Sequence, residues 1–248
     1  MDRWLNVGVK GSAAWPKEEM IVEFGRHKLL LKPATRETEQ SIHIKLRGIS
    51  DLEALTLINR FLSVLAWCSD QPMENLYGWS GNPVPVSVPR QSRTLGSSLA
   101  FPVSVTLQMN KKARLALALF REARTINSGP LEFLGYFKIL NIFWKDKWVS
   151  AGGKRQNSIV EGIRATLPDL RDDLATERLR VLGTTQQDVA RYLYESGRCA
   201  VAHAYADPIV DPDDLADLHR LSEDVHIVKE IAERLIAREM KVPRSIFG

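Results

Sequence analysis

The chain has 248 residues, of which 44% are hydrophobic and 26% charged, and its formal net charge is +4. This is enough apolar sequence to bury a core in one large domain or two small ones. No stretch approaches the roughly 20 apolar residues of a membrane-spanning helix, and the N-terminus lacks the apolar run of a signal peptide. We therefore expect a cytoplasmic protein that does not contact a membrane. The two cysteines, Cys68 and Cys199, create no metal-ligand spacing, so we predict neither a metal nor a cofactor.

The positive charge is concentrated in one stretch of the chain. Residues 111–155 contain ten Lys or Arg and three acidic residues, whereas residues 205–239 contain ten acidic residues and four basic ones. A basic stretch of this kind attracts anions, which include RNA and nucleotides. We expect such a partner to bind the basic stretch and to avoid the acidic one.

Alternation of apolar and polar residues predicts short antiparallel strands in the first third of the chain. Residues 18–32 alternate on both sides of Gly25 and should form a β-hairpin. Residues 41–48 alternate as well, which predicts a half-exposed strand with His43 on its polar face. A histidine in that position is expected to be an ordinary solvated residue.

A helix and a loop follow these strands. Ser50 and Glu53 form a capping-box pattern at the start of about 18 residues of helical periodicity. Residues 73–93 are rich in glycine, proline and aromatic residues, which favours a loop. Tyr77 and Trp79 in that loop either anchor it to its own core, which we favour, or stack on the bases of a nucleic acid.

The periodicity changes near residues 91–98, where a serine-containing stretch indicates a domain boundary. Before it we expect an N-terminal α+β domain, residues 1–98, and after it a helical domain, residues 99–248, so the predicted fold class is α+β. Helices at residues 112–126 and 130–144 should pair as an antiparallel hairpin across an Asn-Ser-Gly turn.

Three basic residues in this part are candidates for binding phosphate or RNA. Lys138, on the second helix of the hairpin, either faces a bound phosphate or extends along apolar surface into solvent, which we favour. Lys154 and Arg155 follow two glycines in residues 151–158, a segment that could cradle an anion. The segment does not match the phosphate-binding loop of nucleotide hydrolases, so a flexible loop is the preferred interpretation.

The most suggestive pattern lies in residues 184–206. Thr184 and Gln187 form a second capping-box pattern, so a helix should begin there. Its last turns are rich in Gly and Ala and carry Arg198 and His203, with four residues between them. We expect both side chains on this helix, about 140° apart around its axis. They would then converge only because an arginine is long or because a partner helix contributes.

The pair resembles the Arg-x4-to-6-His motif of the HEPN superfamily, which lies late in a helical bundle and forms a ribonuclease site across a dimer interface. The segments GRCAVAHA and DPIVDPDD lead into a last long helix, which we expect to be capped by Asp211 and to begin at Pro212. Together they look like the branch named after the methylamine utilisation protein MauJ. The resemblance covers roughly the second half of the chain. It implies a helical bundle and a homodimer, with Arg198 and His203 as catalytic residues acting on RNA.

Two other Arg–His pairs in the chain have a similar spacing. Arg36 and His43 have six residues between them but lie across a linker and a strand, where side chains alternate in direction. Arg220 and His226 have five residues between them on an acidic helix, which would repel a phosphate. We discard the first pair and rank the second below the pair in GRCAVAHA.

Arginine and histidine together are suited to cleaving an RNA phosphodiester by its own 2′-hydroxyl. His203 would act as general base or general acid, and Arg198 would bind the phosphate and offset its developing charge. Glu195 would either orient the guanidinium or neutralise it. Catalytic HEPN motifs usually have Asn, Asp or His directly after the arginine, and Cys199 in that position argues against nuclease activity. A nucleophilic pair of Cys199 with His203 is a weaker alternative.

Two functions from different classes follow from these patterns. The first is a HEPN-like, metal-independent RNA endonuclease with a composite site in a homodimer, since one histidine does not easily serve as both acid and base. The Gly/Ala-rich surface at residues 197–206 suits close self-association. The second is a non-catalytic HEPN-like module, a MauJ-like accessory protein that binds a nucleotide, RNA or protein partner.

Overall fold

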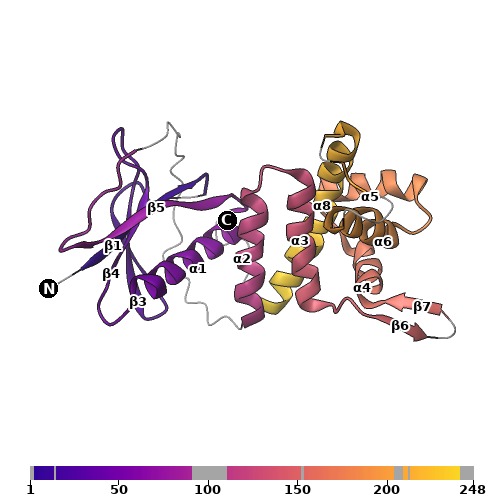
Figure 1. Cartoon of the computed structure of the whole chain (residues 1–248), viewed down its shortest axis with the longest axis horizontal. Coiled ribbons are helices and arrows are strands. Elements are labelled where there is room, and N and C mark those ends of the chain that lie inside the picture. Colours follow the sequence, from indigo (N-terminus) through magenta and orange to yellow (C-terminus); the bar gives the residue numbers. More distant parts are fainter. Residues whose placement is uncertain are drawn as a thin grey trace. The chain divides into compact units, whose positions relative to one another are not determined.

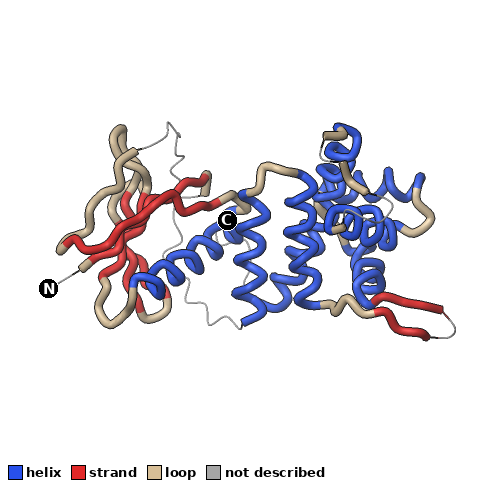
Figure 2. The backbone as a smooth tube through the Cα atoms, viewed as in Figure 1, coloured by secondary structure: helices blue, strands red, loops and turns tan. Residues whose placement is uncertain are grey.

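The computed structural model describes residues 3–13, 15–90, 111–151, 154–203, 209–211 and 213–240, without the side chains of residues 149–151, 154–156, 239 and 240. It divides into a sheet unit, Met1–Thr125 with Pro243–Gly248, and a helical unit, Ile126–Val242. The predicted α+β fold class is confirmed (Figures 1 and 2). The expected boundary between residues 98 and 99 lies outside the described residues, and the two compact units divide after residue 125.

Five antiparallel strands form one sheet in the order β2-β3-β4-β1-β5. The strands are β1 (Trp4–Gly11), β2 (Met20–Phe24), β3 (His27–Lys32), β4 (Ser41–Lys45) and β5 (Met73–Asn82). The predicted hairpin is confirmed, since Phe24 pairs with His27 across a turn in which Gly25 has a φ of 62°. Strand β1, which pairs with both β4 and β5, was not predicted from the sequence.

Strand β5 corrects the loop expected at residues 73–93. It pairs with β1, and Gly78 allows the close approach, because a Cβ at that position would lie 2.6 Å from the carbonyl oxygen of Asn6. Tyr77 and Trp79 stack with their ring centroids 6.2 Å apart. The Tyr77 hydroxyl donates at 2.5 Å to a backbone carbonyl later in the same segment. These contacts anchor the segment to its own unit.

His43 is buried, contrary to the expectation of a solvated strand residue. Its Nε2 lies 2.9 Å from Ser41 Oγ, and its Nδ1 lies 2.9 Å from Asn6 Oδ1. The expectation was wrong because another segment of the chain covers this side of the strand. The backbone N–H of Val86 donates to the same Asn6 oxygen at 2.9 Å. Burial, together with the charge of Lys32, lowers the pKa of His43 to about 4, so the imidazole is neutral in the native protein.

Helices α1 (Asp51–Ser69) and α2 (Lys111–Thr125) complete the sheet unit. The predicted capping box is confirmed, because the Ser50 hydroxyl accepts from Glu53 N–H and the Glu53 carboxylate accepts from Ser50 N–H. Among the described helices, α1 is the one long and apolar enough to cross a membrane by length and composition, and 56% of that span is buried inside the protein. Core helices have the same composition.

Helix α2 carries part of the basic stretch, yet two of its arginines are engaged inside the sheet unit. Arg121 Nη1 donates at 3.1 Å to both the backbone and the side-chain oxygen of Asn59. Arg124 Nε lies 3.4 Å from Asp70 Oδ1. The basic stretch is therefore less free to bind an anion than its composition indicates.

The helical unit contains one β-hairpin and a series of helices. They are α3 (Gly129–Phe143), β6 (Trp148–Ala151), β7 (Lys154–Asn157), α4 (Ser158–Thr166), the 3-10 turn η1 (Leu167–Asp169), α5 (Asp173–Thr185), α6 (Val189–Tyr192), η2 (Leu193–Cys199), α7 (Ala200–Ala202) and α8 (Leu215–Met240). Helix α8 packs along α3 and α5 (Figure 1). The flexible loop expected at residues 151–158 is instead largely the second half of the β6–β7 hairpin.

The helix expected to begin at Thr184 begins later, at α6. Thr184 belongs to α5, and its hydroxyl donates to a carbonyl three residues back at 2.7 Å. Helix α5 ends where Gln186 becomes extended, with φ −116° and ψ 128°. Asp188 then caps α6 by accepting from the backbone N–H of Arg191 at 3.1 Å. A carboxylate caps a helix as well as a hydroxyl does, so the sequence alone did not separate the two sites.

Candidate functional site

The helical run that carries Arg198 is not a continuous α-helix. Leu193–Cys199 form the π-helix η2, in which, for example, the N–H of Ala200 bonds to the carbonyl of Glu195. Such segments are rare and frequently occur at functional sites. One short turn follows, and the chain leaves the helix at His203, whose φ is −134° and ψ 118°. The expectation that Arg198 and His203 share one helix is therefore wrong, because His203 lies at the position that ends it.

Arg198 and His203 nevertheless meet within a single chain. Arg198 Nη1 lies 3.5 Å from His203 Nε2, and both side chains are half-buried. The same Nη1 lies 3.6 Å from the Sγ atom of Cys199, which is a free thiol. The extended backbone at His203 brings the imidazole to the arginine without help from a partner helix.

Asp146, in the segment between α3 and β6, is the acidic partner of this arginine. Its Oδ2 lies 3.1 Å from Arg198 Nη2. Its Oδ1 accepts from the Tyr194 hydroxyl and from Asn157 Nδ2, each at 2.8 Å. Asn157 is itself fixed, because its Oδ1 caps α4 by accepting from Ile159 N–H at 2.8 Å. This carboxylate was not predicted from the sequence, since no local pattern connects it to Arg198.

The ring of Tyr194 makes a cation–π contact with the Arg198 guanidinium. Arg198 Cζ lies 5.7 Å from the centroid of the Tyr194 ring, and the rings of Phe137 and Trp148 pack against that ring at 6.3 and 6.1 Å. Burial, followed by the bond to Asp146, raises the pKa of the Tyr194 hydroxyl above its usual value. The hydroxyl therefore remains a proton donor to Asp146.

Arg198 keeps its positive charge in this setting. Burial by itself lowers the pKa of the guanidinium, but the contact with Cys199 and the negative charge of Asp146 outweigh it. The pKa lies above the usual value for arginine. The side chain can therefore bind an anion at any physiological pH.

Small residues bring η2 and α7 close to the core of their own unit. A Cβ at Gly197 would lie 2.5 Å from Phe133 Cζ of α3, which is far below contact distance. Ala200 is also buried, whereas Ala202 is exposed. Two of the small residues expected at a dimer surface are thus occupied by intramolecular packing.

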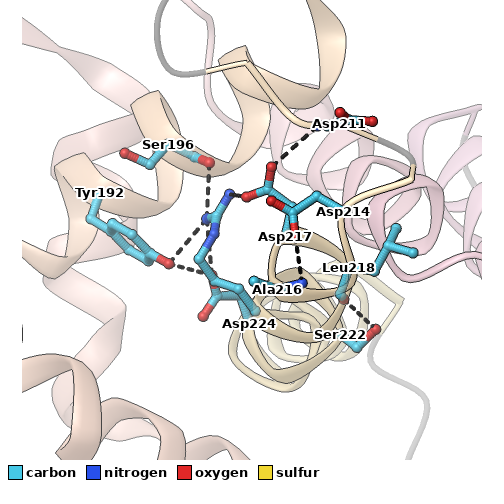
Figure 3. A network of polar contacts seen from close by, with 10 residues as sticks. Tyr192, Ser196, Asp211, Asp214, Ala216, Asp217, Leu218, Ser222 and Asp224 are labelled. Carbon is cyan, nitrogen blue, oxygen red and sulfur yellow. Dashed lines mark hydrogen bonds and ion pairs between the residues drawn. The ribbon is translucent and has the colours of Figure 1, made fainter.

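Arg220 of α8, a member of the competing Arg–His pair, belongs to a different network. Figure 3 labels its partners Tyr192, Ser196, Asp217 and Asp224. Its Nη1 donates at 3.1 Å to the Tyr192 hydroxyl and at 3.1 Å to the Ser196 carbonyl. Its Nη2 lies 3.3 Å from Asp217 Oδ1. The network connects α8 with α6 and with the π-helix.

The centre of that network is the carboxylate of Asp224, which is fully buried. It accepts from the Tyr192 hydroxyl and from Arg178 Nε, each at 2.8 Å, and its Oδ2 lies 3.8 Å from Arg220 Nη1. Burial raises the pKa of Asp224, while Arg178 and Tyr192 act in the opposite direction. Arg220 is therefore engaged in contacts that join the helices of its own unit.

The remaining predicted site residues are Glu195, Lys138, Lys154 and Arg155. Glu195 is exposed, and in the described part of the chain the carboxylate that pairs with Arg198 is that of Asp146. Lys138 is exposed on α3 between buried neighbours. Lys154 and Arg155 lie on β7, and their side chains are outside the description.

A cavity of about 500 Å³ opens beside the first turn of α3. Its lining includes Ser128, Leu131, Leu218 and Val201, the last of which lies between Arg198 and His203 in the sequence. Within the ranges that the structure describes, no three His, Cys, Asp or Glu side chains are grouped so as to hold a metal ion.

The candidate site is thus a half-buried arginine–histidine pair, with an aspartate and a tyrosine in contact with the arginine, in the helical part of an α+β protein. Residues 116–237 match the model of the family described as methylamine utilization protein MauJ. This part of the chain is MauJ-like, and the resemblance noted from GRCAVAHA is confirmed at that level. No curated protein and no solved structure matched the chain.

Proposed function

We propose that the MauJ-like part of the chain is a HEPN-like, metal-independent RNA endonuclease whose catalytic residues are Arg198 and His203. The observation that supports the proposal is the 3.5 Å separation of the guanidinium and imidazole nitrogens in a half-buried setting. A histidine sealed in a dry core would have argued against catalysis. This one is within reach of solvent and next to a fixed positive charge.

The proposed reaction uses the 2′-hydroxyl of the RNA as nucleophile. His203 takes the 2′-hydroxyl proton as the new bond from that oxygen to phosphorus forms, and the bond from phosphorus to the 5′-oxygen breaks. The departing 5′-oxygen receives a proton from the second His203 imidazole of the proposed dimer, leaving a 2′,3′-cyclic phosphate and a 5′-hydroxyl end. Arg198 binds the non-bridging oxygens and offsets their developing charge.

The proposal includes a homodimer, because one histidine does not easily serve as both base and acid in a single turnover. Two copies related by a two-fold axis would supply two imidazoles. Light scattering at micromolar concentration measures the state directly. We expect the mass of a dimer, and a monomer at that concentration would remove the composite site.

A non-catalytic HEPN-like binding module is the second candidate, and two contacts favour it. Asp146 already offsets the charge of Arg198, and Cys199 follows the arginine where catalytic motifs have a stronger hydrogen-bonding residue. Under this alternative the same cluster binds a nucleotide, RNA or protein partner without cleaving it.

The deciding experiment is incubation of the pure protein with mixed RNA in the presence of EDTA. Cleavage should appear in the parent protein and fall by roughly 10²–10⁴-fold in His203→Ala, the usual range for loss of a positioned acid or base. His226→Ala, which removes the half-buried histidine of the competing pair, should leave cleavage unchanged. Equal cleavage by the parent protein and His203→Ala would reject Arg198 and His203 as the catalytic pair, and selective loss in His226→Ala would identify the competing pair as the site.

A further inference from the structure

We infer that Asp146 is a positioning residue for the proposed site: its carboxylate turns the Arg198 guanidinium toward His203 and lowers the affinity of Arg198 for phosphate. The inference rests on the proposed function and adds a residue to it. It starts from the three donors that converge on this carboxylate, the Tyr194 hydroxyl, Asn157 Nδ2 and Arg198 Nη2.

The Asp146 carboxylate is held in place by residues other than Arg198. Two donors from separate elements, η2 and the N-cap of α4, hold its Oδ1 at 2.8 Å each. One of them, Asn157, is only 1% exposed and is fixed by its own bond to the first turn of α4. The other oxygen, Oδ2, is left facing the guanidinium. An aspartate held in this way acts as a fixed reference point rather than as a mobile surface charge.

That reference point determines how the guanidinium is turned. A guanidinium is planar, so a contact at Nη2 fixes the direction of the other nitrogens. With Nη2 at 3.1 Å from Asp146 Oδ2 and the group lying over the ring of Tyr194, Nη1 is directed to His203 Nε2 at 3.5 Å. Without Asp146, a long and flexible arginine would take other rotamers.

The same contact has an electrostatic consequence of opposite sign. A carboxylate beside the guanidinium offsets its charge, so an incoming phosphate competes with Asp146 for Arg198. Removing the charge of Asp146 should therefore strengthen the binding of RNA while the loss of orientation slows its cleavage. Tighter ground-state binding together with slower chemistry separates positioning from simple destabilisation.

The test measures binding and cleavage on the same variants of the full chain. Binding uses an RNA oligonucleotide methylated at every 2′-oxygen, which cannot be cleaved, and kinetics use the unmodified oligonucleotide. For Asp146→Asn we expect binding about fivefold tighter, the effect of one nearby charge in water, and a kcat roughly 10²-fold lower, as for a misoriented catalytic group. Asp146→Glu keeps the charge and changes the reach, so kcat should fall without tighter binding.

Glu177→Gln is the matched control for net charge. Glu177 pairs with Arg180 at 2.7 Å on α5, in the same unit, and both side chains are largely exposed. The substitution also removes one negative charge and should change neither binding nor kcat. If Asp146→Asn behaves like this control in both measurements, the inference is wrong.

Failure of the inference is distinguishable from failure of the proposed nuclease. A parent protein that binds RNA without cleaving it rejects the nuclease. The binding comparison still decides whether Asp146 lowers the affinity of Arg198 for the RNA phosphate. Binding that is unchanged or weaker in a folded Asp146→Asn protein overturns the inference. Should that variant not fold, Tyr194→Phe removes one hydroxyl that holds Asp146 and keeps the ring under Arg198. We then expect about tenfold lower kcat at normal thermal stability, and an unchanged kcat would overturn the inference.

Discussion

Arg220 on α8 donates a hydrogen bond from Nη1 to the backbone carbonyl of Ser196 in the π-helix, at 3.1 Å. The carbonyl groups of a π-helix do not all accept the regular backbone hydrogen bonds of an α-helix. A charged donor from a neighbouring helix therefore stabilises the conformation that presents Arg198. Arg220 thus supports the fold, whereas Arg198 belongs to the candidate site.

The first prediction concerns Arg220→Met, which keeps the apolar stem and removes the guanidinium. Because the buried carboxylate of Asp224 loses one of its cations, we expect a loss of about 3 kcal/mol in the free energy of unfolding. Urea denaturation at neutral pH measures it. His226→Ala on the same helix should cost less than half as much, and an unchanged midpoint in Arg220→Met would mean that the network carries little stability.

The second prediction uses two glycines in helices of the same unit. Gly197→Ala places a Cβ 2.5 Å from Phe133 Cζ, so overpacking should destabilise the protein by about 1–3 kcal/mol. Gly183→Ala, on α5, meets no atom within 4 Å and should stabilise it by about 0.5–1 kcal/mol through helix propensity. Thermal melts of both variants test the contrast. Two shifts of the same sign would contradict the close packing of η2 on α3.

The third prediction is a pH dependence that arises from His43. Its pKa is lowered to about 4 in the native protein from 6.5, so between these values the unfolded chain binds a proton that the native chain does not. The contribution of the neutral His43 side chain to the free energy of unfolding is fully present above about pH 6.5. It is lost as the pH falls toward 4, by about 3 kcal/mol in total. Denaturant titrations at several pH values measure this slope. His43→Asn should flatten the slope, and an identical slope in both proteins would exclude His43 as its source.

The fourth prediction concerns the basic stretch. If RNA binds through phosphate contacts, its affinity should fall steeply between low and physiological salt, with a logarithmic slope of about 0.7 per contact for a single strand. Lys138→Gln should reduce the slope only if Lys138, exposed on α3, contacts a phosphate. Fluorescence anisotropy with a labelled oligonucleotide provides the measurement. Affinity that does not respond to salt would remove nucleic acid as a partner.

Local patterns in the sequence predicted the local parts of the fold. The hairpin at Gly25 and the capping box of Ser50 with Glu53 each depend on residues within a few positions of one another. Strand β5 and the burial of His43 were missed because they depend on what a distant segment covers. Alternation reports one polar face, and it does not report whether another part of the chain lies over that face.

The candidate site divides in the same way. The spacing of Arg198 and His203 drew attention to a pair that the fold brings within 3.5 Å. Asp146 and Asn157 were missed because they join Arg198 only through the tertiary structure. The extended conformation of His203 was missed as well, because a helical wheel assumes that the helix continues.

The π-helix also decides how the two ends of this helical run are phased. A π-turn holds one residue more than an α-turn, so the same residues wound as an ordinary α-helix from Val189 to Ala200 would lose this phasing. Arg198 would then rotate by about 100° relative to the preceding helix, away from Asp146, although the letters from Arg198 to His203 would be unchanged. A motif search would still find the pair in such a chain. The rotational phase of the helix, which no spacing rule records, would have separated it from its aspartate.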